Sequence, residues 1–166
     1  MALYTRITES VVSTLTSALD LVTTTAPLSY SIVQDLATGV GANQADMLWS
    51  DQRTLTASAT EDLDLAGSLT GPLGGTLTFA RVKYLLVKAL ATNTNDVVVS
   101  RAAAGIPLFS ATGDALAINP GGWFAWGAPT AAGIVVTPTS AESITVTNSA
   151  GGTSVIYDVI VIGASA

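Results

Sequence analysis

The sequence contains no cysteine and no histidine among its 166 residues. Without cysteine the chain has no disulfides, thiolate metal sites or thiol nucleophiles. Without histidine it lacks the side chain that most often serves as general base and metal ligand, and the usual Ser-His-Asp triad cannot form. We therefore expect a protein that is not an enzyme and that holds no cofactor and no metal ion.

Charge is also scarce, since 11% of the residues are charged and 49% are hydrophobic. The six Lys and Arg residues are scattered and the net charge is −6. This balance opposes nucleic-acid binding, which depends on cations that displace the counterions of the phosphates. We expect no nucleic-acid partner, and a surface that is largely uncharged or covered by other subunits.

Long apolar runs are missing as well. The longest run, residues 84–91, contains Lys88 and is far shorter than the roughly 18 residues of a membrane-spanning helix. Residues 1–6 lack the basic region and apolar stretch of a signal peptide. These features predict no membrane partner and synthesis in the cytoplasm without secretion.

The residues that are abundant favour strands, because Thr, Ser, Val, Ile and Gly dominate and good helix formers are sparse. Apolar or alternating segments recur about every 8 to 12 residues between Gly, Pro and Asn turns, which is typical of an antiparallel β-sandwich or barrel. The expected strands are residues 11–21, 28–36, 47–57, 59–69, 76–91, 97–99, 116–118, 123–126, 134–136, 143–147 and 155–162.

The N-terminal region allows two interpretations. Residues 1–26 are rich in threonine and poor in charge, and the segment Thr23–Pro27 reads as a break. Fully extended, such a segment spans up to roughly 90 Å, whereas a domain of this size has a radius of gyration of ~15 Å. We expect residues 1–26 to form either an extended arm or a first strand, and residues 27–166 to form a single β-sandwich domain.

The final expected strand is apolar on both faces. Such a strand packs one face on the core and the other on a second subunit. Trp123, Phe124 and Trp126 follow a Gly-Gly turn, and because neighbouring strand residues point to opposite faces, at least one ring points away from the core. The candidate interface residues are Trp49, Trp123, Phe124, Trp126, Tyr157, Val159 and Val161.

Two pairs of acidic residues could form a binding or catalytic site. Strand alternation places Asp62 and Asp64 on one face, where paired carboxylates could bind Ca²⁺ or cleave a glycoside, but an ordinary solvated strand gives the same pattern. Asp46 and Asp51 lie near Asn43 and could bind a ligand or make turns through side-chain hydrogen bonds. We favour the structural interpretation for both groups.

Several segments, in their order along the chain, resemble those of one family. They are Gly41-Ala-Asn-Gln-Ala45 with Leu48-Trp-Ser-Asp51, Ala59-Thr-Glu-Asp-Leu-Asp-Leu-Ala-Gly67, Phe79-Ala-Arg-Val-Lys83, Asn119-Pro-Gly-Gly122 and Tyr157-Asp-Val-Ile-Val-Ile-Gly163. The sequence resembles the jelly-roll decoration (cement) proteins of tailed-bacteriophage heads.

The resemblance implies a jelly-roll-like, antiparallel β-sandwich that forms a homo-oligomer, a trimer, on the outer surface of the virion head. It implies the major capsid protein as a partner and no active site, and the candidate interface residues would then face another subunit or the capsid. A tail or fibre module that recognises host-surface glycan through Trp49, Trp123 or Trp126 is the alternative. A glycosidase using Asp62 and Asp64 is a third interpretation.

Overall fold

The computed structural model describes residues 2–166, and these residues form fourteen strands and no helix. The described chain accordingly has no helix long and apolar enough to cross a membrane. The predicted all-β class is confirmed. The eight main strands of the sandwich are β4 (Met47–Leu55), β5 (Thr60–Asp64), β8 (Arg81–Ala89), β9 (Val97–Ser100), β10 (Ala115–Ile118), β11 (Trp123–Gly127), β13 (Ser143–Asn148) and β14 (Val155–Ala164).

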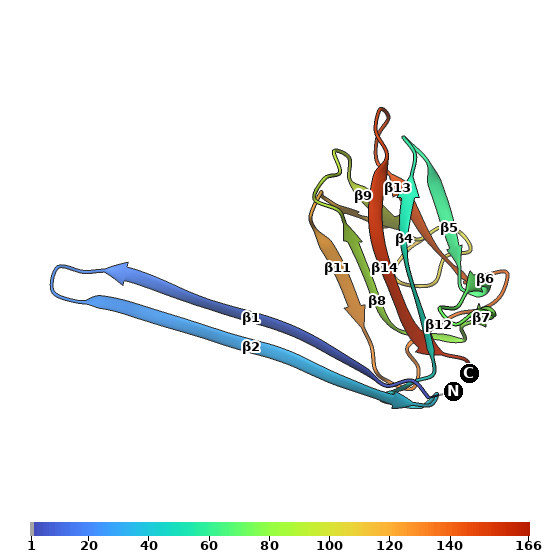
Figure 1. Cartoon of the computed structure of the whole chain (residues 1–166), viewed down its shortest axis with the longest axis horizontal. Coiled ribbons are helices and arrows are strands. Elements are labelled where there is room, and N and C mark those ends of the chain that lie inside the picture. The colour runs from blue at the N-terminus through green and yellow to red at the C-terminus, as the bar shows by residue number, and fades with distance from the viewer. Residues whose placement is uncertain (1) are drawn as a thin grey trace.

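The main strands form two antiparallel sheets, ordered β11-β8-β14-β4 and β10-β9-β13-β5 (Figure 1). In chain order, the first main strand pairs with the eighth, the second with the seventh, the third with the sixth and the fourth with the fifth. This order is the connectivity of a jelly roll, so the predicted antiparallel, jelly-roll-like sandwich is confirmed. The sequence pattern alone did not give this order.

Four further strands are short: β3 (Gln44–Ala45) pairs with the end of β2, β6 (Ala66–Thr70) pairs with β7 (Thr76–Thr78), and β12 (Ile134–Val135) pairs with β8 of the sandwich. The single strands expected at residues 59–69 and 76–91 are wrong in extent, since each divides in two. The division occurs where the Phe79 N–H donates to the Leu65 carbonyl at 2.9 Å, which turns β6 and β7 into a separate small hairpin.

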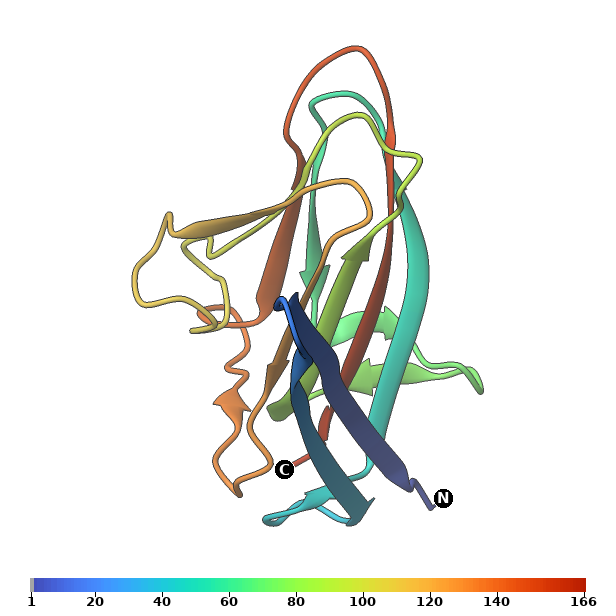
Figure 2. The ribbon, with the colours of Figure 1, turned by 90° about the vertical axis from the view of Figure 1, so that its left-hand side faces the viewer.

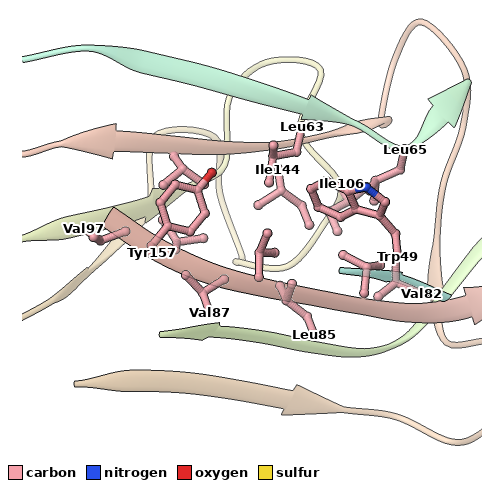
Figure 3. Packing of buried hydrophobic residues seen from close by; sticks show 14 of the residues in the cluster. Trp49, Leu63, Leu65, Val82, Leu85, Val87, Val97, Ile106, Ile144 and Tyr157 are labelled. Atoms are coloured by element: carbon pink, nitrogen blue, oxygen red, sulfur yellow. The ribbon is translucent and has the colours of Figure 1, made fainter. Parts of the chain in front are cut away.

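The core lies between the two sheets and is built by alternation along the strands. On β14, residues 155, 157, 159 and 161 are fully buried, whereas Ile156, Asp158 and Ile160 point outward and are half-buried. Figure 3 shows Trp49, Leu63 and Tyr157 pointing into the space between the sheets. The period of two predicted for this strand is therefore confirmed, and it decides which β14 residues are core.

The first two strands, β1 (Thr5–Ala18) and β2 (Thr23–Thr38), form a long antiparallel hairpin that projects from the base of the sandwich (Figure 1). The break expected at Thr23–Pro27 is wrong, because β2 runs continuously through Pro27, which pairs with Thr14. Proline is compatible with a strand whose outer side is unpaired, as in a two-stranded ribbon. The proposed division between residues 26 and 27 thus falls inside β2.

The hairpin is attached to the sandwich through a small apolar cluster. Leu36 of β2 is buried against Ala45 and Ile162, and Ile7 of β1 packs on the same cluster. The outer side of β14, which we expected to contact another subunit, is in part covered here by the chain's own hairpin. Buried contacts of this kind fix the direction in which the hairpin leaves the sandwich.

A buried lysine supports the same attachment. The Lys83 ammonium donates to the carbonyls of Gly41 (3.4 Å), Ala131 (2.9 Å) and Thr130, and burial lowers its pKa. The pairing of β8 with β14 shifts at Gly163, so that Lys83 lies opposite no β14 residue. This register shift is a β-bulge. It allows the Lys83 side chain to connect the turn after β2 with the loop after β11.

Candidate assembly surface

The hairpin has two faces of different chemistry, because residues paired across antiparallel strands point to the same side. One side carries the pairs Val11–Tyr30, Ser13–Leu28 and Glu9–Ile32. The other side carries mostly Thr and Ser, together with the ion pair between Arg6 and Asp35. We call the first side the apolar face; its exposed large residues are Val11, Leu15, Leu28, Tyr30 and Ile32.

The apolar face is open to solvent over most of its length. Its five large residues are between 48% and 74% exposed. Leu36 and Ile7 belong to the same face by register, and they are the residues that pack on the sandwich at the base. One continuous apolar stripe therefore begins in a packed contact and continues into water. Contiguous exposed apolar surface of this kind marks an interaction site.

The hairpin leaves the sandwich on the side of the sheet β11-β8-β14-β4 (Figures 1 and 2). Residues of the apolar face and residues on the outer side of this sheet line the same groove, so the two surfaces face each other. This groove of about 820 Å³ separates them, with Tyr30 and Ile32 among the lining residues of the hairpin. Its opposite wall, the sheet wall, is lined by Tyr84, Leu86, Lys88, Gly121, Trp123 and Ala125. Both walls of the groove are thus largely apolar.

Two charged residues of opposite sign line the groove. Glu9 is on the hairpin and Lys88 is on the sheet, and neither is in an ion pair within the described chain. Burial and, to a lesser extent, the negative charge of Glu9 raise the pKa of Tyr84 on the sheet wall. The groove therefore combines apolar walls with one unpaired charge on each side.

Seven residues were expected at an interface, and for four of them the prediction is wrong because they do not lie on the surface. Trp49, Tyr157, Val159 and Val161 lie in the core of the single chain, because strand alternation points them between the sheets. Their apolar side chains pack inside the sandwich and are not accessible to a partner.

The other three expected residues lie on β11. Phe124 and Trp126 are half-buried and pack against the core, with the Phe124 ring 6.2 Å from that of Phe109 between centroids. Trp123 is 70% exposed and lines the groove, so the structure places it together with the apolar face. The apolar residues of β1 and β2 were not predicted as a site. Their alternation was visible in the sequence, but the register that joins them was not.

Asp46, Asp62 and Asp64 accept hydrogen bonds from other residues of the chain. Asp62 accepts from the Thr145 hydroxyl, and Asp64 accepts from the Ala66 N–H at 2.7 Å and from Ser68. Asp46 accepts from the Ser165 N–H and hydroxyl. Within residues 2–166 no three acidic side chains stand close enough to hold a metal ion together. These contacts favour the structural interpretation of Asp62 and Asp64. Asp51 accepts from the Gln52 N–H, which is the local kind of hydrogen bond expected, but it does so within β4 and not in a turn. The turn expected at Asp46 is also wrong, because its partner Ser165 is distant in the chain.

Glu61 joins the two sheets through the core. It accepts from the Tyr157 hydroxyl at 2.7 Å and from the Arg53 guanidinium. Burial and the hydrogen bond to Glu61 raise the pKa of Tyr157 well above its ordinary value of 10.0. The folded chain therefore keeps this proton at pH values where the unfolded chain has lost it.

We expect this difference to appear as a loss of stability above pH 10. Because the folded state binds more protons there, the free energy of unfolding should fall by up to about 1.4 kcal/mol per pH unit. Tyr157→Phe should be roughly 1 to 2 kcal/mol less stable than the natural chain at pH 8, and this deficit should shrink by about 1 kcal/mol at pH 11. Urea unfolding at both pH values measures it, and a deficit independent of pH would contradict the assignment.

Comparison with other proteins adds nothing to these observations, since no family model, curated protein or solved structure matches the chain.

Proposed function

We propose that this chain is a structural assembly protein that binds other subunits through the apolar face of its β1–β2 hairpin. In its specific form the proposal is a decoration protein that bridges subunits on the outside of a bacteriophage capsid, with the major capsid protein as partner. The observation that carries the proposal is the continuous apolar stripe on a hairpin that projects from the sandwich.

The energetics of that stripe support an assembly role. A Val, Leu or Ile side chain gains roughly 1.5 to 3 kcal/mol when it is fully removed from water. The five exposed residues of the apolar face begin about half exposed, so covering them contributes on the order of 5 kcal/mol before the costs of association. A single such contact is modest, but many linked contacts on a shell reinforce one another through effective concentration.

The low charge and the fold agree with this role. A net charge of −6 and six cations leave most of the surface uncharged, which suits burial against neighbouring subunits more than solvation. Jelly rolls occur in viral capsid domains and also in lectins and cupins, so the fold raises the expectation by analogy only.

The test uses particles purified on a density gradient from cells that produce this chain naturally. We expect the chain to band with the particles at a fixed ratio to the main shell protein and to stay bound in 1 M salt, on the order of tenfold above physiological ionic strength, because apolar contacts are not screened. Immunogold label should lie on the heads. Recovery of the chain in the soluble fraction alone would overturn the proposal.

The exposed Trp123 favours one alternative, a tail or fibre module that binds host-surface glycan. Aromatic rings stack on sugars, and this ring is 70% exposed on the groove wall. Immunogold label on tails, together with saturable binding to an oligosaccharide array that Trp123→Ala abolishes, would support this alternative over capsid decoration.

A further inference from the structure

We propose that the sheet wall of the groove is covered by the hairpin of a second copy of this chain, whose apolar face lies on that wall. This inference rests on the proposed function and names one partner of the same surface. It makes Leu15, Leu28 and Tyr30 of one copy, and Trp123 of the other, parts of one interface.

The contact at the base of the hairpin is the first support. There, the apolar face already packs on the outer side of the sheet, with Leu36 and Ile7 in one cluster with Tyr84 and Ile162. Beyond the base the two surfaces diverge, and both remain exposed across the groove. A second copy presents the same two surfaces, so exchange of hairpins repeats a contact that the chain makes within itself.

The charges of the groove are the second support. Glu9 is the only charged residue on the apolar face, and Lys88 is the only charged residue among those of the sheet that line the groove. Asp158, which lies opposite Lys88 on β14, lines a neighbouring hollow together with Lys88 but forms no ion pair with it, and accepts a hydrogen bond from Gln52 at 2.8 Å. An incoming hairpin would bring Glu9 to Lys88, and opposite charges placed this way fix orientation.

Symmetry makes the arrangement self-limiting. When each copy both offers its hairpin and receives another, closure of the ring covers every apolar face. An open arrangement would leave one hairpin and one groove exposed and would continue to grow. The inference therefore predicts a discrete oligomer, whose mass gives the number of copies.

The experiment measures the native molar mass of the full chain by light scattering from about 1 to 100 μM, a range that brackets micromolar affinities. The test variant is Leu15→Asp, and the matched control is Val12→Asp. Both residues are on β1 and both are 74% exposed, but they point to opposite sides of the hairpin. Circular dichroism should show both variants folded, because neither side chain is packed.

We expect the natural chain and Val12→Asp to form the same oligomer, and Leu15→Asp to dissociate with an association constant about 100-fold lower. A monomeric natural chain, an oligomer indifferent to Leu15→Asp, or equal losses in both variants would overturn the inference.

A charge exchange tests whether the contact is between copies. Glu9→Lys and Lys88→Glu should each weaken association roughly tenfold. When the two variants are mixed, the lysine at position 9 of one meets the glutamate at position 88 of the other, so association should recover fully in a ring with an even number of copies and in part in a ring with an odd number, where one interface joins two copies of the same variant. Failure of the mixture to recover would overturn the inference, since a contact within one chain cannot be repaired by mixing.

The outcomes separate this inference from the proposed function. A chain that bands with particles but is monomeric in solution has a shell subunit in its groove, which overturns the inference and keeps the function. A chain that forms the groove-dependent oligomer but is absent from particles keeps the inference and overturns the function.

Discussion

Gly163→Ala is expected to destabilise the sandwich by at least about 3 kcal/mol, because a Cβ atom at this position has no room. It would lie 2.0 Å from the Arg81 carbonyl oxygen and 2.8 Å from the Phe79 ring. The first of these neighbours is backbone, so relief requires β14 to move away from β8 at the bulge. Since Lys83 and the base of the hairpin depend on this bulge, loosening should extend to the hairpin attachment.

Urea unfolding followed by tryptophan fluorescence measures this effect, with Gly127→Ala as the control. Gly127 is in the same sheet, and its added Cβ would meet only the Tyr84 ring at 3.6 Å, an ordinary contact. We expect the control to change the free energy of unfolding by less than about 1 kcal/mol. Equal stability of the two variants would mean that β14 and β8 do not approach each other as described.

Trp49→Ala is the second large effect, expected to lower the free energy of unfolding by about 3 to 5 kcal/mol. The Trp49 ring is 5% exposed and fills the core between the sheets near Leu65 and Val82 (Figure 3). Its removal leaves a cavity that the rigid strands around it can close only in part.

Trp123→Ala is the matched comparison, because it deletes the same side chain from the surface. Its stability should stay within about 0.5 kcal/mol of the natural chain, while association of copies should weaken about tenfold or more. The pair of variants separates a core tryptophan from an interface tryptophan. Loss of stability in Trp123→Ala, or none in Trp49→Ala, would contradict the placement of the two rings.

Much of the sandwich could be predicted from local pattern. Side chains of residues 155–162 alternate between the two faces because this is a property of any strand. The sequence alone therefore predicts which of these residues share a face. The turns at residues 93–96 and 148–152 are likewise visible as clusters of Asn, Gly and polar residues, but the hairpins that they suggest are wrong, because each turn joins strands of different sheets. Pairing of strands distant in the chain, such as β4 with β14, depends on tertiary packing and was not visible.

The candidate surface was missed for a physical reason. A strand with two apolar faces does not reveal which face is core, so the sequence favours an interface for Tyr157, Val159 and Val161, although the structure points them inward. The apolar face of the hairpin arises only when β1 and β2 pair, which brings Val11 beside Tyr30. Pro27 suggested a break between these strands because the sequence cannot show that its outer side is unpaired.

The native molar mass of the full chain, measured beside that of Leu15→Asp and Val12→Asp, tests most directly whether the apolar face joins copies of this chain. We expect a discrete oligomer for the natural chain and for Val12→Asp, and a monomer of 16.8 kDa for Leu15→Asp. A natural chain that remains a 16.8 kDa monomer at 100 μM, about the concentration at which even weak specific contacts form, would contradict this expectation.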